Sequence, residues 1–130
     1  MKKNIKISVL SQKEINNFKK FIRVHHSKKH IFVKSLKVLK WFYYNNKKLN
    51  FVIAHKDKKI LGVQGFIPIK KFDSKLDNSI FLAYWRVKKT KEIGIGFKIF
   101  KYLSKNKKFM GVVGIANNLL NYHKWQGFRV

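Results

Sequence analysis

The sequence predicts one domain of the α/β or α+β class, built on a mixed β-sheet. Hydrophobic residues alternate at strand spacing in some segments and recur at helical spacing in others. These segments follow the order β-α-α-β-β-β-α-β-α, and the last residues have the pattern of one further strand. No internal repeat and no linker rich in Pro, Gly or Ser divides the 130 residues, a length typical of a single domain.

The first strand and helix are predicted by an alternating segment followed by a helix-start signal. Residues 4–10 alternate apolar and polar side chains, as in a half-buried strand. Ser11 and Glu14 have the spacing of a capping box, which predicts a helix beginning near Ile15. Residues 33–44 show helical spacing again, so a second helix is expected there after a break around the histidines that follow the first helix.

The centre of the chain predicts a hairpin and then a buried strand. Residues 50–55 and 59–69 read as two strands joined by a polar turn. Gly62 and Gly65 inside the second of these strands predict bulges or close backbone contacts. Residues 79–87 are apolar along most of their length, as in a central strand.

The C-terminal third predicts a strand-helix-strand unit with parallel strands. A helix should run to about residue 104, with Phe97, Phe100 and Leu103 on its core side, and a strand should occupy 109–115. A short helix is expected over 117–125, followed by Gly127 in its C-terminal cap.

Composition excludes several classes of function. The chain has no Cys, which excludes disulfides, thiolate zinc sites and thiol nucleophiles. Only five acidic side chains are present, and His26 and His30, though four residues apart, have no evident third ligand, so no metal is predicted. No apolar run reaches the roughly 20 residues that span a bilayer, and no apolar segment follows Met1 as in a signal peptide. We therefore expect a cytoplasmic protein.

The charge is the most unusual feature, with 31 Lys and Arg against 5 Asp and Glu, or +26 in total. Such a balance favours a polyanionic partner, and nonspecific binding of nucleic acid is one interpretation. The lysines are spread along the whole chain, however, as on solvated surfaces. Consecutive aromatic residues from Trp41 to Tyr44 form either a base-stacking platform or, for at least half of them, part of the core.

A glycine-rich turn carries the strongest chemical signal. Lys91, Gly94 and Gly96 lie between the central strand and the next helix, where free backbone N–H groups favour an anion such as a pyrophosphate. A Walker motif is absent, and Ile99 occupies the place of the third glycine of a dinucleotide-binding turn.

These residues resemble the GNAT N-acyltransferases, whose signature is Gln/Arg-x-x-Gly-x-Gly/Ala after the fourth strand. Here it reads Lys91-x-x-Gly94-x-Gly96, and a Tyr that precedes a Gly-Phe pair in the family is matched by Tyr122 or by His123. The element order also agrees. Trp85 and its neighbours resemble sugar N-acyltransferases of surface-polysaccharide clusters. A seventh strand is missing, so residues 1–130 would be one domain, incomplete at its C-terminal end. The alternatives to an active enzyme are an inactive GNAT fragment and a small basic module that binds nucleic acid or the ribosome.

The resemblance implies acetyl-CoA or another acyl-CoA as co-substrate and a small amine, such as that of an amino sugar, as acceptor. Backbone of residues 84–87 would bind the pantetheine arm. Tyr122 or His123 would protonate the leaving thiolate, although adjacent helical residues point about 100° apart. Asp73 or Asp77, or a water, would act as base. The co-substrate residues implied are Trp85, Arg86, Val87, Lys91, Glu92, Ile93, Gly94, Ile95, Gly96 and Asn117.

Overall fold

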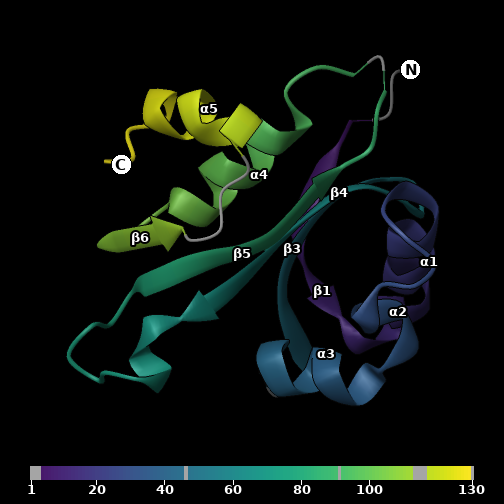
Figure 1. Ribbon diagram of the computed structural model, residues 1–130, viewed down its shortest axis with the longest axis horizontal. Coiled ribbons are helices and arrows are strands. Elements are labelled where there is room, and N and C mark those ends of the chain that lie inside the picture. The colour runs from purple at the N-terminus through teal and green to yellow at the C-terminus, as the bar shows by residue number, and fades with distance from the viewer. Residues whose placement is uncertain (1–3, 46, 91, 113–116, 130) are drawn as a thin grey trace.

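The structure is a computed structural model, and it describes residues 4–45, 47–90, 92–112 and 117–129. A mixed sheet separates two groups of helices (Figure 1). The strands are β1 (Lys6–Ser11), β2 (Tyr44–Asn45), β3 (Lys48–Lys56), β4 (Lys59–Pro68), β5 (Ser79–Val87) and β6 (Phe109–Val112). The helices are α1 (Ile15–His25), α2 (Ile31–Lys34), α3 (Leu36–Tyr43), α4 (Ile95–Ser104) and α5 (Leu120–Trp125), with 3-10 turns at Gln12–Glu14, Ile69–Lys71 and Asn117–Leu119.

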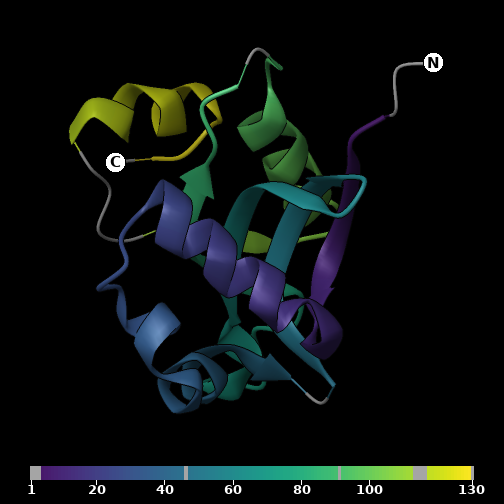
Figure 2. The same cartoon turned by 90° about the vertical axis from the view of Figure 1, so that its right-hand side faces the viewer.

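The sheet confirms the predicted fold class. Its order is β1-β3-β4-β5-β6, with β2 paired to β3. All neighbours are antiparallel except β5 and β6, which are parallel and are joined through α4 as predicted. Figure 2 shows α1 crossing one face of the sheet, while α4 and α5 lie on the other. Apolar side chains on the two faces form separate core clusters.

The capping box is present where the sequence predicts it. The backbone N–H and the hydroxyl of Ser11 both donate to Glu14 Oε1, at 3.2 and 2.8 Å. The first turn is a 3-10 turn, and α1 then buries Phe18, Phe21 and Ile22 against the sheet. The cap thus fixes where the helix begins, and its apolar stripe fixes which face it buries.

The hairpin and its glycines also agree with the sequence. Strands β3 and β4 turn at Asp57, whose φ of 55° lies in the left-handed region. A Cβ on Gly62 would lie 3.1 Å from the side chains of Ile95 and Ile99, and one on Gly65 would lie 2.9 Å from two aromatic rings. The register of β4 also shifts at Gly65. Both predicted features, bulge and close approach, are therefore found.

The helix predicted over 33–44 is wrong in its bounds, because Ser35 divides it. Ser35 has extended backbone angles (φ −133°, ψ 103°), and its hydroxyl accepts from the Val38 N–H at 3.3 Å. It therefore caps α3 instead of continuing α2. His30 caps α2 in the same way, through Nδ1 and the Phe32 N–H. Side chains that accept from the backbone start helices more readily than they extend them.

Two predictions of buried aromatic residues are also wrong. Helix α4 buries Ile95, Ile99 and Leu103, while Phe97 is 43% exposed. Leu103 is buried as predicted and Phe100 packs against the core, so only Phe97 departs from the prediction, because it lies outside the row spaced by four that faces the sheet. Of the four aromatic residues from Trp41 to Tyr44, only Tyr43 is buried. Helix α3 has only eight residues and buries two of them, Leu39 and Tyr43, so the other aromatic side chains of this segment stay at the surface.

The C-terminal segment follows its prediction in part. Strand β6 is described to Val112, and the rest of the predicted 109–115 strand lies outside the described residues. Gly127 (φ 100°) ends α5 as expected, since its N–H donates to Lys124 O and the Phe128 N–H donates to His123 O, at 3.0 and 3.1 Å. Phe128 is not part of a strand. Within the described ranges, every helix is too short or too polar to cross a membrane.

Candidate functional site

Strand β5 is longer than the part of β6 that the structure describes. Within the described part of the chain, β6 pairs with β5 from Ser79 to Leu82, and the last pair is Leu82 with Val112. On its other edge β5 stays paired with β4 as far as Val87. The segment from Ala83 to Val87 therefore extends beyond the described end of β6. A strand edge that borders a pocket can pair through its backbone N–H and C=O groups with an extended ligand.

A β-bulge follows directly after the last described pair between β5 and β6. Gln64 opposes Trp85 and Phe66 opposes Leu82, so two residues, Ala83 and Tyr84, oppose Gly65 alone. Both turn toward the α1–α3 face, where they pack against its core cluster. The buried amide of Gln64 donates to the carbonyls of Gly65 (3.0 Å) and Tyr84 (3.3 Å), and also to that of Ala83. The bulge thus changes which face each later residue of β5 occupies.

The half of β5 that ends at Val87 is open to a large pocket of about 650 Å³, which Trp85, Arg86 and Val87 line. Residues 85–89, the end of α1 and the 3-10 turn before α5 form its walls. The pocket is cationic, because Arg86, Lys88 and Lys89 line it together with His25 and none of its lining residues is acidic. Arg86 Nε donates to the His25 carbonyl at 2.8 Å, which ties β5 to α1.

The N-terminus of α4 lies next along the chain. Gly94 caps the helix with φ 82°, and its carbonyl accepts from the Lys98 N–H at 2.9 Å. Ile93 before it is 93% exposed, and the first turn of α4 carries no acidic residue. The first N–H groups of this helix and the positive end of its dipole thus remain available to an anion.

The predicted turn residues divide between several environments. Glu92 pairs with Lys56 on β3 at 2.8 Å, which anchors the turn to the sheet and partly neutralises its carboxylate. Ile95 is buried in the core, so only its backbone is available. Lys91 lies outside the described residues. Asn117 is exposed in the turn before α5, next to Asn118, which lines the large pocket.

Stacked aromatic rings attach α5 to this site. Trp85 and Tyr122 stack at 5.9 Å with an interplanar angle of 13°, and Trp125 also stacks on Tyr122, at 6.1 Å and 26°. Trp85 also covers the first turn of α4, where a Cβ on Gly96 would lie 2.7 Å from the indole. Helix α5 itself buries no residue fully. It is therefore held mainly by ring contacts at the edge of the molecule.

Both candidate acids, Tyr122 and His123, line a small cavity beneath α5. It measures about 10 Å³, roughly the space for one water, and Gln64, Trp85 and Gly96 also line it. His123 Nδ1 donates to the Leu119 carbonyl at 2.9 Å, which leaves Nε2 for proton transfer. Burial raises the pKa of the Tyr122 phenol. Two adjacent residues of one helix thus reach the same space.

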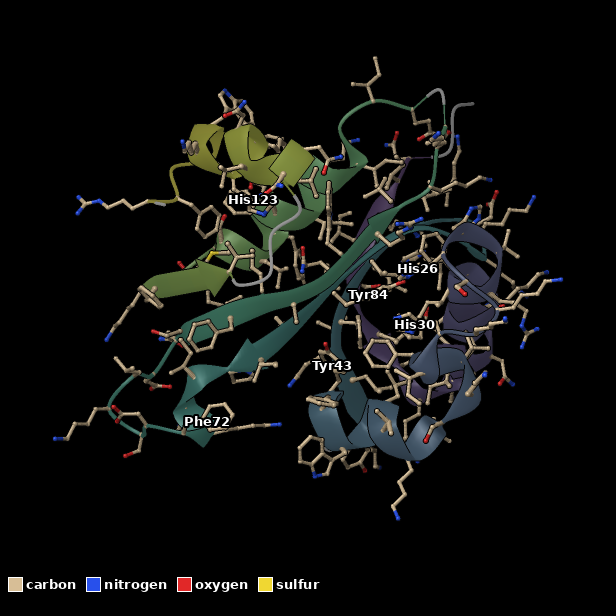
Figure 3. All side chains as sticks on the ribbon, viewed as in Figure 1. His26, His30, Tyr43, Phe72, Tyr84 and His123 are labelled. Carbon is tan, nitrogen blue, oxygen red and sulfur yellow. The ribbon has the colours of Figure 1, made fainter. Side chains whose placement is uncertain are left out.

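A cluster on the opposite face was not expected from the sequence. Tyr84 from the bulge meets His26, whose Nδ1 lies 2.6 Å from its Oη, and the His30 ring lies 5.1 Å away (Figure 3). The Tyr43 oxygen accepts the Tyr84 backbone N–H. Simple alternation could not reveal the cluster, since the bulge turns both Ala83 and Tyr84 toward one face. The spacing of His26 and His30 was its only sequence signal.

Two other expectations concern bases and metals. Asp73 caps the turn before β5 by accepting from the Lys75 N–H, and Asp77 lies 3.7 Å from Lys70. Both are exposed in the loop that precedes β5, at its end away from the open half, so the structure does not bring them to the site. In the ranges that the structure describes, no three His, Asp or Glu side chains are grouped as metal ligands.

The fold can be compared with solved structures. A Pyrococcus horikoshii protein described as an acetyltransferase superposes on 99% of this chain with a TM-score of 0.68 and 12% identity. This chain spans only 44% of that protein's length. An aminoglycoside N-acetyltransferase in complex with coenzyme A matches 98% of this chain and 89% of its own, with a TM-score of 0.69 and 13% identity. No family sequence model and no curated protein sequence matches the chain.

A third solved structure with this architecture is described as a member of the GNAT family. It is an acetyltransferase of the GNAT family from Staphylococcus aureus, with a TM-score of 0.58 and 18% identity over 95% of this chain and 82% of its own. The chain has the GNAT acetyltransferase fold. Without the two-residue β2, β5 is the fourth strand, after which the GNAT signature is expected. At these identities the likeness concerns the fold, so activity has to be argued from the site.

Proposed function

We propose that the protein is an acyl-CoA-dependent N-acyltransferase that transfers an acetyl or other acyl group to a primary amine. One observation carries the proposal: the end of β5 lines a cationic pocket and leads to the N-terminus of α4, where no side chain caps the helix. An acyl-CoA has a matching shape, with an amide-bearing arm that ends in a pyrophosphate. The solved aminoglycoside N-acetyltransferase that binds coenzyme A shares this fold.

The co-substrate would bind as an added strand. The amides of the pantetheine arm would pair with the backbone of Trp85, Arg86 and Val87, and the N–H groups of the turn up to Gly96 would receive the pyrophosphate. Lys88 and Lys89 supply positive charge along the way. Side-chain identity matters little for such backbone contacts, which explains how exposed Ile93 can belong to the site.

The reaction would place positive charge on the attacking amine nitrogen and negative charge on the leaving sulfur. The amine nitrogen attacks the thioester carbonyl carbon, the carbon–sulfur bond breaks, and the leaving thiolate takes a proton. Tyr122, whose phenol stays protonated at neutral pH, faces the small cavity and can donate that proton. His123 beside it can donate a proton from Nε2 only as an imidazolium, because its Nδ1–H is bonded to the Leu119 carbonyl. That cavity has room for about one water, so the thioester reaches these groups only when α5 moves away from Trp85. Ring contacts without a buried anchor allow this movement.

The acceptor is proposed to be a small amine such as that of an amino sugar. Support comes from the resemblance of Trp85 and its neighbours to sugar N-acyltransferases, and from the aminoglycoside acceptor of one protein with this fold. The pocket's cations favour acceptors that are uncharged or carry an anionic group.

Calorimetric titration with acetyl-CoA tests the proposal. Gly94→Glu places a carboxylate at the proposed pyrophosphate site, so its affinity should fall at least tenfold. Gly127→Glu is the matched control: Gly127 also has a positive φ (100° against 82°) and open space around its Cα, but it lies at the end of α5. Equal affinities for all three proteins, or no binding by the wild type, would contradict the proposal.

A second candidate function, binding of single-stranded nucleic acid, is favoured by the surface of α3. Trp41 is 77% exposed, Phe42 and Tyr44 are also exposed, and Lys40 Nζ lies 5.9 Å from the centre of the Tyr44 ring. No acidic residue occurs between Ile15 and Lys56. Exposed rings among lysines suit stacking of bases along a phosphate backbone.

Fluorescence anisotropy with a labelled oligouridine tests this second function. Binding should weaken steeply with salt, and Trp41→Ala should reduce it at least fivefold. Phe72→Ala is the control, because Phe72 is equally exposed (77%) in the loop before β5. Equal losses for the two variants would reduce the binding to nonspecific attraction.

A further inference from the structure

The cluster around Tyr84 has no task in the function proposed above. It lies on the α1–α3 face, at the bulge in β5, and side chains from α1, α2, α3 and β5 meet there. Figure 3 shows His26 and His30 converging on Tyr84 from the end of α1 and the turn after it. A histidine and a tyrosine in direct contact can pass a proton between them. Packing alone needs no such pair, because apolar side chains would fill the same space.

The contact between His26 and Tyr84 is well defined. His26 Nδ1 and Tyr84 Oη are 2.6 Å apart, and the two rings stack at 5.5 Å with an interplanar angle of 25°. Tyr43 accepts the Tyr84 backbone N–H, so the strand beneath the phenol is fixed as well. His26 is exposed, so its other nitrogen can exchange protons with water.

The electrostatics set the protonation of both groups near neutral pH. Burial raises the pKa of Tyr84 to about 12, with Arg86 opposing and Tyr43 adding to the rise. Burial and the charge of Arg86 lower the pKa of His26, and burial lowers that of His30 with His26 beside it. No carboxylate is among the groups that shift these values. The phenol is therefore protonated and the imidazole neutral, which makes Tyr84 the donor and His26 Nδ1 the acceptor in their hydrogen bond.

We propose that Tyr84 and His26 form a relay that removes the proton from the attacking amine. The proposal rests on the N-acyltransferase function above. As the carbon–nitrogen bond forms, the N–H bond breaks and its proton passes to Tyr84 Oη, while the proton of Tyr84 passes to His26 Nδ1. His26 becomes an imidazolium and then loses a proton to water from Nε2. Tyr84 is the catalytic residue, and His26 acts through it.

The position of Tyr84 supports this relay. The bulge turns Tyr84 to the α1–α3 face, whereas Trp85 faces α4 and stacks on Tyr122. An acyl group lying against the open half of β5 would thus have the relay on one face and the candidate thiolate acids on the other. The proton that leaves the amine and the proton that reaches the thiolate would then follow separate routes. Deprotonation of the amine would therefore not depend on the protonation state of the group that protonates the thiolate.

The tautomer of His26 gives a test that needs no acceptor. Nitrogen-detected NMR of the five histidines at pH 8 should show His26 protonated at Nε2, with Nδ1 accepting from Tyr84. Tyr84→Phe should remove the upfield shift that accepting this hydrogen bond causes at the Nδ1 nitrogen. An Nδ1–H tautomer in the wild type would overturn the relay, because Nδ1 could then receive no proton.

Kinetics test the relay during turnover, with release of the CoA thiol as readout. The protein has no Cys, so a thiol reagent reports CoA alone. With glucosamine, spermidine and lysine methyl ester as amines, Tyr84→Phe and His26→Gln should each lower kcat at pH 7.5 by 10²-fold or more, and the double variant no further. The acidic limb of the pH–rate profile should also disappear in His26→Gln. His55→Gln, which removes an imidazole from β3, should keep both rate and limb.

The outcomes separate the relay from the function beneath it. Absence of acetyl-CoA binding contradicts the acyltransferase proposal itself. Binding with transfer to none of these amines, or transfer with an unchanged acidic limb in His26→Gln, overturns the relay and leaves the co-substrate site intact.

Discussion

The two faces of the sheet differ in how their helices are attached. On the α1–α3 face, Phe18, Ile22, Leu39 and Phe51 are fully buried, and side-chain hydrogen bonds join the helices to β5. On the other face, α4 buries a row of aliphatic residues, but α5 beyond it buries none and depends on stacked rings.

This difference indicates which half of the molecule is able to move. Local opening costs least where few apolar contacts are lost, so α5 can separate from Trp85 while the α1–α3 face stays closed. Groups that must keep a fixed geometry, such as Tyr84 and His26, lie on the closed face. The groove proposed for acyl-CoA lies under the helix that can move.

The largest expected effect comes from removing a central ring on the closed face. Phe51 is fully buried and contacts the rings of Phe18 and Tyr43, at 4.6 and 4.3 Å between centroids. Phe51→Ala should lower the free energy of unfolding by about 3–5 kcal/mol. Phe97→Ala on the α4–α5 side should cost less than about 1 kcal/mol, because that ring is already exposed. Urea denaturation compares the free energies of unfolding of the two variants. Similar losses would contradict the difference in packing between the two faces.

A methyl group added at two tight glycines sharpens the same comparison. Gly65→Ala would bring a Cβ to 2.9 Å from Phe51 and Tyr43, which cannot yield, so a loss of about 1–3 kcal/mol is expected. Gly96→Ala meets Trp85 at 2.7 Å, but that ring can shift together with α5. Its cost should be smaller, and tryptophan fluorescence should change. A larger loss for Gly96→Ala would show that α5 is fixed.

The response to pH should also come from the closed face. The pKa values of His25, His26 and His30 are lowered, chiefly by burial, below the usual 6.5. Below that value the unfolded chain binds more protons than the folded one, so stability should fall as the pH drops through about 6.5 and be fully present above it. Urea midpoints from pH 5 to 8 measure this. A midpoint that rises on acidification would contradict the protonation assigned to these groups.

The smallest effect is expected for the ion pair that anchors the α4 turn. Lys56 and Glu92 are 2.8 Å apart but both remain partly exposed, so Glu92→Gln should change stability by about 0.2–1 kcal/mol. Thermal denaturation at low and high salt checks this, since high salt should remove most of the difference.

Local signals predicted much of this architecture. The capping box at Ser11 and Glu14, the hairpin, and the bounds of β5 each depend on neighbouring residues and were correct. The glycine turn before α4 was also placed correctly, because a buried strand and a helix flank it.

Features that depend on contacts distant in sequence were missed. Ser35 divides a helix through a hydrogen bond that its neighbours do not require. The exposure of Trp41 reflects how little of the sheet α3 covers. The bulge at Ala83 and Tyr84 is defined only by pairing with β4, so the meeting of Tyr84 with His26 could not be predicted from either segment alone.

Backbone amide NMR with added acetyl-CoA tests the central claim most directly. If acyl-CoA binds along the open half of β5 beneath a movable α5, shifts should concentrate at Trp85–Val87, Gly94–Gly96 and Tyr122, while Leu39 and Phe51 on the closed face remain unchanged. Shifts spread evenly over the surface lysines, or no shifts at millimolar acetyl-CoA, would contradict the account.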